Sequence, residues 1–320
     1  MKKNKGKLSK KEFAKEITKN LNQYFKEVLD MKVTAREQKL SRANQPDCWA
    51  IVLTKENSNA SPALILSKLY NRYLEGDTID NLTVSIAMGC MQALTCPPPE
   101  FMTLRKESLR EKLRVRVINS ERNQEYMMDV PSMEVVPGIH MICDVQVQNV
   151  QGEKWRTKVT QSLMQDMEYN PATMMEEALR NSLKEHPPVL MELREDGDLS
   201  ANLLGKEDYR MDPDSMYILS TKDTLMGAAA MFYPGVQQRL AEMAGGNYYA
   251  IPSSVHEFIV LPEKGFYDEE ELQATLQSAN RELVPPEEVL SDTVYVYDEE
   301  LSVMLSCREY TEFVDTECMA

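Results

Sequence analysis

Residues 216–262, MYILSTKDTLMGAAAMFYPGVQQRLAEMAGGNYYAIPSSVHEFIVLP, decide the fold class of this chain. They predict a strand, a helix and then two apolar strands at 248–251 and 255–261. Pro252-Ser253-Ser254 between these two strands is typical of a hairpin. Since 255–261 is apolar on both faces, we expect it to be a central strand with His256 at least partly buried.

The rest of the chain predicts further helices and strands in mixed order. A capping box at Ser9 and Glu12 starts the first helix, Asn170 and Asp268 cap later ones, and residues 139–147 alternate like a half-buried strand. We therefore predict an α+β fold with mixed, mainly antiparallel sheets and flanking helices. The predicted helices are 9–28, 61–76, 80–93, 100–112, 171–184 and 268–283, and the further strands are 32–40, 48–54, 113–118, 139–147, 293–297 and 301–307.

Charge divides the chain into two unequal parts. Residues 1–116 hold 22 Lys+Arg against 13 Asp+Glu, a formal +9, and the remainder holds 14 against 38, or −24. The length suits one large domain or two lobes. From the charge break we predict a disordered basic tail at 1–8, a basic α+β lobe at 9–116 and an acidic α+β lobe at 117–320. The simplest interpretation is that the two lobes match each other within the chain, because the acidic part repels nucleic acid.

The sequence predicts a cytoplasmic protein that does not enter a membrane. No apolar run approaches the ~20 residues of a membrane-spanning helix. The basic segment 1–11 is not followed by the apolar stretch of a secretory signal. The six cysteines are scattered and form no Cys-x-x-Cys motif, which favours reduced thiols.

The candidate catalytic residues are Ser254 and His256. His256 and Glu257 open a zinc-protease pattern, but Val260 stands where the second histidine is required. Neighbouring residues of a strand point to opposite faces, so Glu257 cannot easily meet His256, whereas Ser254 shares its face. A hydrolase built around Ser254 and His256 is therefore one alternative, although the sequence has no Gly-x-Ser-x-Gly elbow.

The candidate metal ligands are Asp196, Asp198, Ser200 and Glu207, which occupy positions one, three, five and twelve of a calcium-loop pattern. Ala201 stands at the sixth position, where the sharp turn needs glycine. We therefore favour an acidic, solvated loop over a metal site. The glycine motifs that bind phosphates or dinucleotides do not occur, so we expect no cofactor.

Lysines are concentrated at the start of the chain. Such a cluster can reach phosphates without a fold of its own. A nucleic-acid-associated factor that uses the basic N-terminal lobe is therefore the second interpretation of function. The residues that would carry it are Lys2, Lys3, Lys5, Lys7, Lys10 and Lys11.

Three segments carry a resemblance to a known family: GAAAMFYPG at 227–235, IPSSVHEFIVLP at 251–262 and LVPPEEVLSDTVYVY at 283–297. Together with ALILSKLYNRYLEG at 63–76, they resemble an uncharacterised family of Gram-positive gut bacteria, a domain of unknown function that often accompanies mobile genetic elements. The resemblance implies a setting and no reaction. Our leading interpretation is a non-catalytic, soluble protein that acts through protein–protein contacts as a mobile-element accessory factor.

Overall fold

The computed structural model describes residues 7–56, 63–95, 106–148, 154–194, 197–265 and 267–318. The chain forms two compact units, which we describe separately. Unit 1 comprises Met1–Arg42, Pro46–Leu104 and Val147–Glu153, and unit 2 comprises Ala43–Gln45, Arg105–Gln146 and Lys154–Ala320. The boundary predicted at residue 116 lies inside a strand of unit 2, Leu113–Asn119.

Unit 1 contains a three-stranded sheet in the order β1-β2-β3, with helices packed against it. Its first helix begins where the capping box predicts: the Ser9 hydroxyl accepts from the Glu12 N–H at 3.3 Å, and the Glu12 carboxylate accepts from the Ser9 N–H at 2.8 Å. The elements of unit 1 are α1 (Lys10–Glu27), β1 (Val33–Arg42), β2 (Gln45–Lys55), β3 (Ala63–Ile65), α2 (Ser67–Glu75) and α3 (Ile79–Thr95).

The prediction of one helix over 61–76 is wrong for its first part. Ala63–Ile65 forms β3 and pairs antiparallel with β2, and α2 begins only at Ser67. Pairing with a neighbouring strand supplies the backbone hydrogen bonds there, which a local Ser-Pro start signal cannot reveal. The predicted end is correct, because Gly76 terminates α2 in the left-handed conformation at φ 117°.

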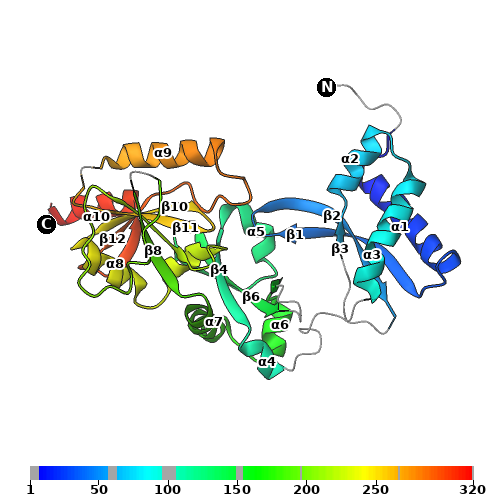
Figure 1. Ribbon diagram of the computed structural model, residues 1–320, viewed down its shortest axis with the longest axis horizontal. Helices are drawn as coiled ribbons and strands as arrows, with labels where there is room; N and C mark the ends of the chain where they lie inside the picture. The colour runs from blue at the N-terminus through cyan, green and yellow to red at the C-terminus, as the bar shows by residue number, and fades with distance from the viewer. Residues whose placement is uncertain are drawn as a thin grey trace. The chain divides into compact units, whose positions relative to one another are not determined.

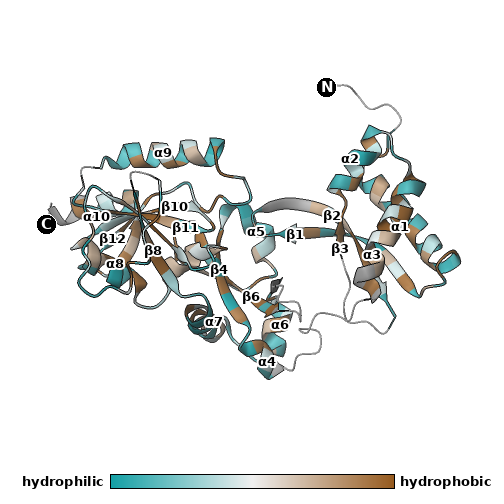
Figure 2. Cartoon of the chain, in the orientation of Figure 1, coloured by the Kyte–Doolittle hydropathy of each residue, from teal (hydrophilic) through white to brown (hydrophobic). Residues whose placement is uncertain are grey.

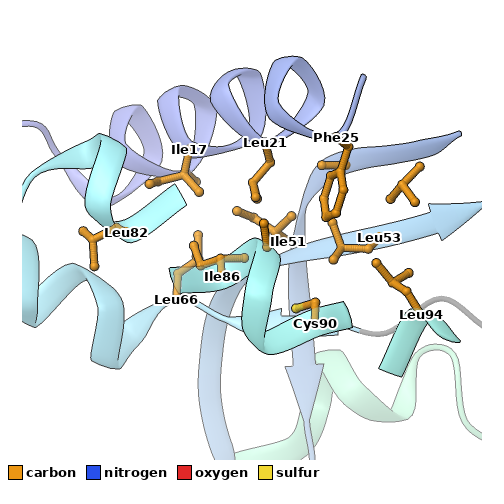
Figure 3. Packing of buried hydrophobic residues seen from close by; sticks show 14 of the residues in the cluster. Ile17, Leu21, Phe25, Ile51, Leu53, Leu66, Leu82, Ile86, Cys90 and Leu94 are labelled. Carbon is orange, nitrogen blue, oxygen red and sulfur yellow. The ribbon is translucent and has the colours of Figure 1, made fainter. Parts of the chain in front are cut away.

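The core of unit 1 lies between the helices and the sheet. Phe13, Ile17, Leu21 and Phe25 recur at four-residue spacing on α1, and none of them is exposed. Val28, the last residue of the helix predicted from the sequence, is 62% exposed because α1 ends at Glu27. Figure 3 shows Ile17, Leu21 and Phe25 pointing toward partners from β2 and α3, namely Ile51, Leu53, Leu82, Ile86, Cys90 and Leu94.

Unit 2 contains two sheets. The larger has six strands in the order β13-β12-β10-β11-β9-β8, and every neighbouring pair is antiparallel. In the smaller, β6 pairs with β4, β5 and β7. This architecture confirms the predicted α+β class with mainly antiparallel sheets and flanking helices (Figure 1). The helices are α4 (Lys106–Arg110), η2 (Glu121–Asn123), α5 (Gln124–Met127), α6 (Gln161–Asp166), α7 (Pro171–Glu185), η3 (Gly227–Phe232), α8 (Val236–Ala244), α9 (Glu269–Glu282) and α10 (Cys307–Cys318). The strands are β4 (Leu113–Asn119), β5 (Ser132–Val136), β6 (Ile139–Gln148), β7 (Lys154–Lys158), β8 (Pro188–Leu193), β9 (Met216–Thr221), β10 (Tyr248–Ser254), β11 (Glu257–Pro262), β12 (Tyr295–Asp298) and β13 (Val303–Ser306).

Several elements of unit 2 are missing from the sequence predictions, among them α5, α6, β5, β7, β8 and α10. β8 begins at Pro188, the second of two successive prolines, and pairs with β9 along its whole length. The helix α10 occupies a segment whose start was predicted as strand. It begins at a second capping box, in which Ser306 Oγ accepts from the Glu309 N–H at 3.2 Å and the Glu309 carboxylate accepts from the Ser306 N–H at 2.9 Å.

Candidate functional site

The hairpin that carries Ser254 and His256 turns two residues later than predicted. Val255 and His256 form the turn, and β11 starts at Glu257, so the expectation of a strand from residue 255 is wrong at its first two positions. The Val255 N–H donates to the Glu288 carbonyl at 2.8 Å, which takes it out of the strand ladder. The expectation of a central strand holds for β11, which lies between β10 and β9. The His256 side chain is 24% exposed, as expected for partial burial.

The imidazole of His256 is engaged away from Ser254. Its Nδ1 accepts from the Met226 N–H at 3.0 Å, which places the ring proton on Nε2, 3.7 Å from a carboxylate oxygen of Glu288. The Ser254 hydroxyl instead accepts from the backbone N–H of His256 at 3.1 Å. A base that activates serine needs an unprotonated ring nitrogen facing the hydroxyl. In this arrangement His256 fixes the loop before η3, and the pair does not form a nucleophile and base.

The predicted calcium-loop residues support the edge of the six-stranded sheet. Asp196 lies outside the described residues. Ser200 Oγ accepts from the Glu192 N–H at 2.8 Å and donates to the Ala201 carbonyl at 3.0 Å, so Ser200 is part of the backbone arrangement along β8. Asp198 and Glu207 have exposed side chains. Within the described ranges, no group of three or more His, Cys, Asp or Glu residues could hold a metal ion.

A second histidine lies in a buried polar network that sequence reasoning missed. His186 ends α7, as predicted, but its Nδ1 also lies 3.1 Å from a carboxylate oxygen of Asp223. Its Nε2 lies 3.3 Å from the amide nitrogen of Gln146, whose oxygen accepts from Arg156 Nε at 2.9 Å. Nearby, burial raises the pKa of Tyr233 to about 12. Since both nitrogens of His186 have polar partners, it connects α7 to the loop that follows β9 and is not positioned as a general base.

The predicted lysines divide between the described residues and those outside them. Lys2, Lys3 and Lys5 lie outside. Lys7 Nζ donates to the Tyr73 carbonyl at 2.6 Å and lies 4.5 Å from the centre of that ring. Lys10 lies 6.0 Å from the ring centre of Tyr70. Within the described residues, the lysine cluster therefore lies against the two tyrosines of α2 at Lys7 and Lys10 and continues along α1 with Lys11.

The feature of unit 2 that most suggests a binding site is one half of a sheet face. On the core face of the six-stranded sheet, the residues of β8, β9 and β11 have no exposure at all: Leu190, Tyr217, Leu219, Phe258 and Val260. On the opposite face, α9 covers β10 and β12, where the packed residues are 0–7% exposed: Tyr249, Ile251, Val294 and Val296. The part of that opposite face formed by β8 and β9 is not covered in the same way, and β11 lies at the boundary, because Leu261 is 2% exposed within the covered cluster and Ile259 packs against it.

We call this uncovered part the open sheet face. The strand register makes it continuous: Leu193 pairs with Met216 on one side and with Leu199 on the other, so their side chains share one face. These three side chains are 38%, 38% and 45% exposed. The next row, in which Met191 pairs with Ile218 and Ile218 with Ile259, is partly exposed as well. The open sheet face consists of Met191, Leu193, Leu199, Met216 and Ile218, with Ile259 at its border with the covered cluster.

Its composition differs from that of an ordinary solvent-facing sheet. Antiparallel sheets that face water usually alternate apolar residues inward with polar residues outward. Here the partly exposed residues that β8 and β9 place on this face are apolar, whereas α9 carries hydrophilic residues, as the colours of Figure 2 show. The edge of β8 is already occupied, because the Ser200 N–H donates to the Glu192 carbonyl and the Leu203 N–H to the Leu190 carbonyl. What is open is therefore the face of the sheet and not its edge.

The charges around the open sheet face are mainly acidic. Four described charged residues other than Glu192 lie within two positions of its members along the chain, and three of them are acidic: Arg194, Asp198, Asp214 and Glu257. Glu192 points to the opposite face, where it pairs with Tyr217 and accepts from Ser215 Oγ at 2.9 Å. Unit 2 as a whole holds 20 Lys+Arg against 39 Asp+Glu, a formal −19. A ligand for this face therefore needs an apolar centre and basic flanks.

In the described ranges, no helix is long and apolar enough to cross a membrane, and the side chains of Cys48, Cys90, Cys143 and Cys307 form no disulfide.

The comparisons with known proteins identify a family but no function. Neither the curated proteins nor the solved structures contain a significant match to the chain. One family model matches residues 10–299, which is most of the chain, and no activity is established for that family. The chain therefore belongs to the family of unknown function DUF5688.

Proposed function

We propose that this protein is a non-catalytic binding protein, and that the open sheet face of unit 2 is where it holds its partner. The partner we propose is an amphipathic helix of another protein, with an apolar face and lysine or arginine flanks. Following the resemblance described above, we place both proteins in the cytoplasm and propose that they serve a mobile genetic element. The observation that carries the proposal is the contrast between the covered and uncovered halves of one sheet face.

The geometry favours a helix over a strand as the partner. A strand would need a free sheet edge, and residues 199–203 already bond to the edge of β8. Neighbouring strands lie about 4.8 Å apart, so β8, β9 and β11 span about 10 Å. This is the width of one helix, about 10–12 Å with its side chains. A helix seated beside α9 would complete the layer that α9 begins.

Covering the open sheet face is expected to contribute a modest binding free energy for each side chain. Full burial of a Leu, Ile or Met side chain is worth about 1.5–3 kcal/mol. Leu193 and Met216 each keep 38% exposure. Covering what remains exposed is therefore worth about 0.5–1 kcal/mol for each side chain. Leu199 is similarly exposed, and Met191 and Ile218 have less area left to cover, so apolar contact and attraction between basic flanks and the surrounding acidic residues must both contribute to affinity.

The first prediction uses a defined peptide. A Leu/Lys amphipathic helix of about 18 residues, roughly 27 Å long, should bind the full chain. The double variant Leu193→Asn with Met216→Asn should weaken binding roughly tenfold, because it removes about 1–2 kcal/mol of apolar contact. Fluorescence anisotropy of the labelled peptide measures this change.

Matched controls make the result specific. Leu301→Asn with Met128→Asn changes two exposed apolar residues elsewhere in unit 2 and should leave the affinity unchanged. A Leu/Glu peptide with the same apolar pattern should not bind, because the acidic residues around the open sheet face would repel its glutamates. Equal loss in both double variants, or equal binding of the acidic peptide, would reject the open sheet face as the site. If the chain instead forms dimers that Leu193→Asn abolishes, a second copy is the occupant and the proposed partner is wrong.

A further inference from the structure

The lysines of α1 form a line on one side of the helix. With 100° between successive residues, four of them fall in a sector about 80° wide. All four are exposed, and they lie away from the apolar residues that α1 buries. The three glutamates of α1 lie outside this sector. We call this set the lysine stripe: Lys11, Lys15, Lys19 and Lys26.

Most of the charge on the stripe is not neutralised locally. Lys19 Nζ lies 3.8 Å from the Glu16 carboxylate, but the two side chains are 73% and 44% exposed, so water screens the pair. Across the part of the chain that the structure describes, Lys11, Lys15 and Lys26 make no ion pair. The stripe therefore presents a line of positive charge to solvent.

Two hydrogen bonds hold this line beside an edge strand. Asn22 lies within the same sector, and its side-chain amide donates to the Ala35 carbonyl at 2.9 Å and accepts from the Ala35 N–H at 2.8 Å. Ala35 belongs to β1, the outer strand of the sheet, and the next residue is the exposed Arg36. The double hydrogen bond therefore fixes the orientation of this line beside β1, whereas Arg36 points to the other face of that strand because neighbouring residues of a strand alternate.

We infer that the lysine stripe is a docking surface for the phosphodiester backbone of nucleic acid, bound without sequence preference. This goes beyond the proposed function, because it concerns unit 1 and a different class of partner. Lysines four positions apart are separated by about 6 Å along the helix axis. A nucleic-acid strand offers one phosphate per nucleotide along its length, and lysine binds phosphate as a point charge. The four stripe residues are all lysines, which suits backbone contact better than the reading of base edges.

The net charge of each unit limits the expected affinity for nucleic acid. Unit 1 holds 16 Lys+Arg against 12 Asp+Glu, a net +4, whereas unit 2 is −19. Binding should therefore be weak and should depend steeply on salt. Nonspecific complexes of this type have dissociation constants of about 1–100 µM at physiological salt, and they tighten at lower salt. The sequence predicts phosphate contacts by the lysines at the start of the chain, and the structure adds the orientation of the lysines that follow on α1.

The test compares two variants of equal charge. The full chain is titrated into a labelled DNA duplex of about 20 base pairs at about 50 mM salt and upward. The stripe variant K11Q/K15Q/K19Q/K26Q should bind at least about tenfold more weakly, and its log–log salt slope should be shallower by about 3–4. The control K68Q/K184Q/K206Q/K222Q removes four exposed lysines elsewhere and should change affinity less than about threefold.

Several results would overturn the inference. They are equal weakening by both variants, absence of duplex binding by the unmodified chain at about 50 mM salt, and an unchanged salt slope in the stripe variant. Polyglutamate of similar length serves as the protein-like polyanion. If it binds the stripe as tightly as DNA does, the surface fits acidic proteins and the nucleic-acid assignment is wrong. Far-ultraviolet circular dichroism confirms that each variant keeps its helix content.

Discussion

Replacing Asp144 by alanine is expected to lower the free energy of unfolding of unit 2 by about 3–5 kcal/mol, because it leaves the Arg116 charge buried without its partner. Arg116 Nε donates to one Asp144 oxygen at 2.6 Å, and Nη2 donates to the Tyr126 hydroxyl at 2.9 Å. The side chains of Arg116 and Asp144 are 14% and 7% exposed. Burial alone would lower the pKa of Arg116, but the charge of Asp144 raises it above its ordinary value.

A double variant separates the cost of losing the ion pair from the cost of leaving the buried Arg116 charge without a partner. Arg116→Leu with Asp144→Leu removes both charges and should cost less than Asp144→Ala alone, since no buried charge then lacks a partner. Urea unfolding followed by circular dichroism gives the comparison. A cost below about 1 kcal/mol for Asp144→Ala, or a larger cost for the double variant, would show that the pair does not stabilise the interior as described.

Replacing Gly227 by alanine should be comparably damaging, for a steric reason. A Cβ at this position would lie 2.2 Å from Ser220 Oγ, 2.7 Å from the His256 carbonyl and 2.7 Å from the Thr221 nitrogen. Two of these neighbours are backbone atoms, so the clash can be relieved only by moving β9 or the hairpin turn. Overpacking of this kind costs about 1–3 kcal/mol and sometimes more, and we expect the upper end or beyond.

The control for this variant is Gly205→Ala, which should be nearly neutral because a Cβ there would meet nothing within 4 Å. Adding Ser220→Ala to Gly227→Ala should restore only part of the stability, because the two backbone contacts remain. Thermal unfolding of the three variants measures both effects. If Gly227→Ala unfolds at the temperature of the unmodified protein, the close packing of η3 against β9 is not as described.

What could be predicted from the sequence was mostly local. Ser9 with Glu12, Asn170 with Pro171 and Asp268 with Glu271 mark helix starts within four residues, and all three starts are correct. The position of β6 is also visible locally, but its prediction as a half-buried strand is wrong, because residues 141–145 are buried on both faces. Such signals need only backbone preferences and neighbouring side chains, so no knowledge of the tertiary fold was required.

What could not be predicted depends on partners distant in the sequence. The bond between His256 and Met226 joins residues 30 positions apart, and it decides which nitrogen of His256 carries the proton. The contact between His186 and Asp223 likewise joins residues that are distant in the sequence. The open sheet face could not be predicted for a different reason. The apolar runs of β8 and β9 are visible in the sequence, but which strands α9 covers depends on the packing of the folded unit.

The central claim is that the open sheet face holds a partner helix, and site-specific photo-crosslinking in the native cell tests it most directly. A photoreactive amino acid replaces Ile218 on the open sheet face, and Ala274 on the exposed side of α9 is the matched control position. We predict that the Ile218 position crosslinks to one protein through an amphipathic helical peptide with lysine or arginine flanks, and that the Ala274 position does not. If Ile218 yields no more adduct than Ala274, or if its adducts lie within the chain itself, the claim is wrong.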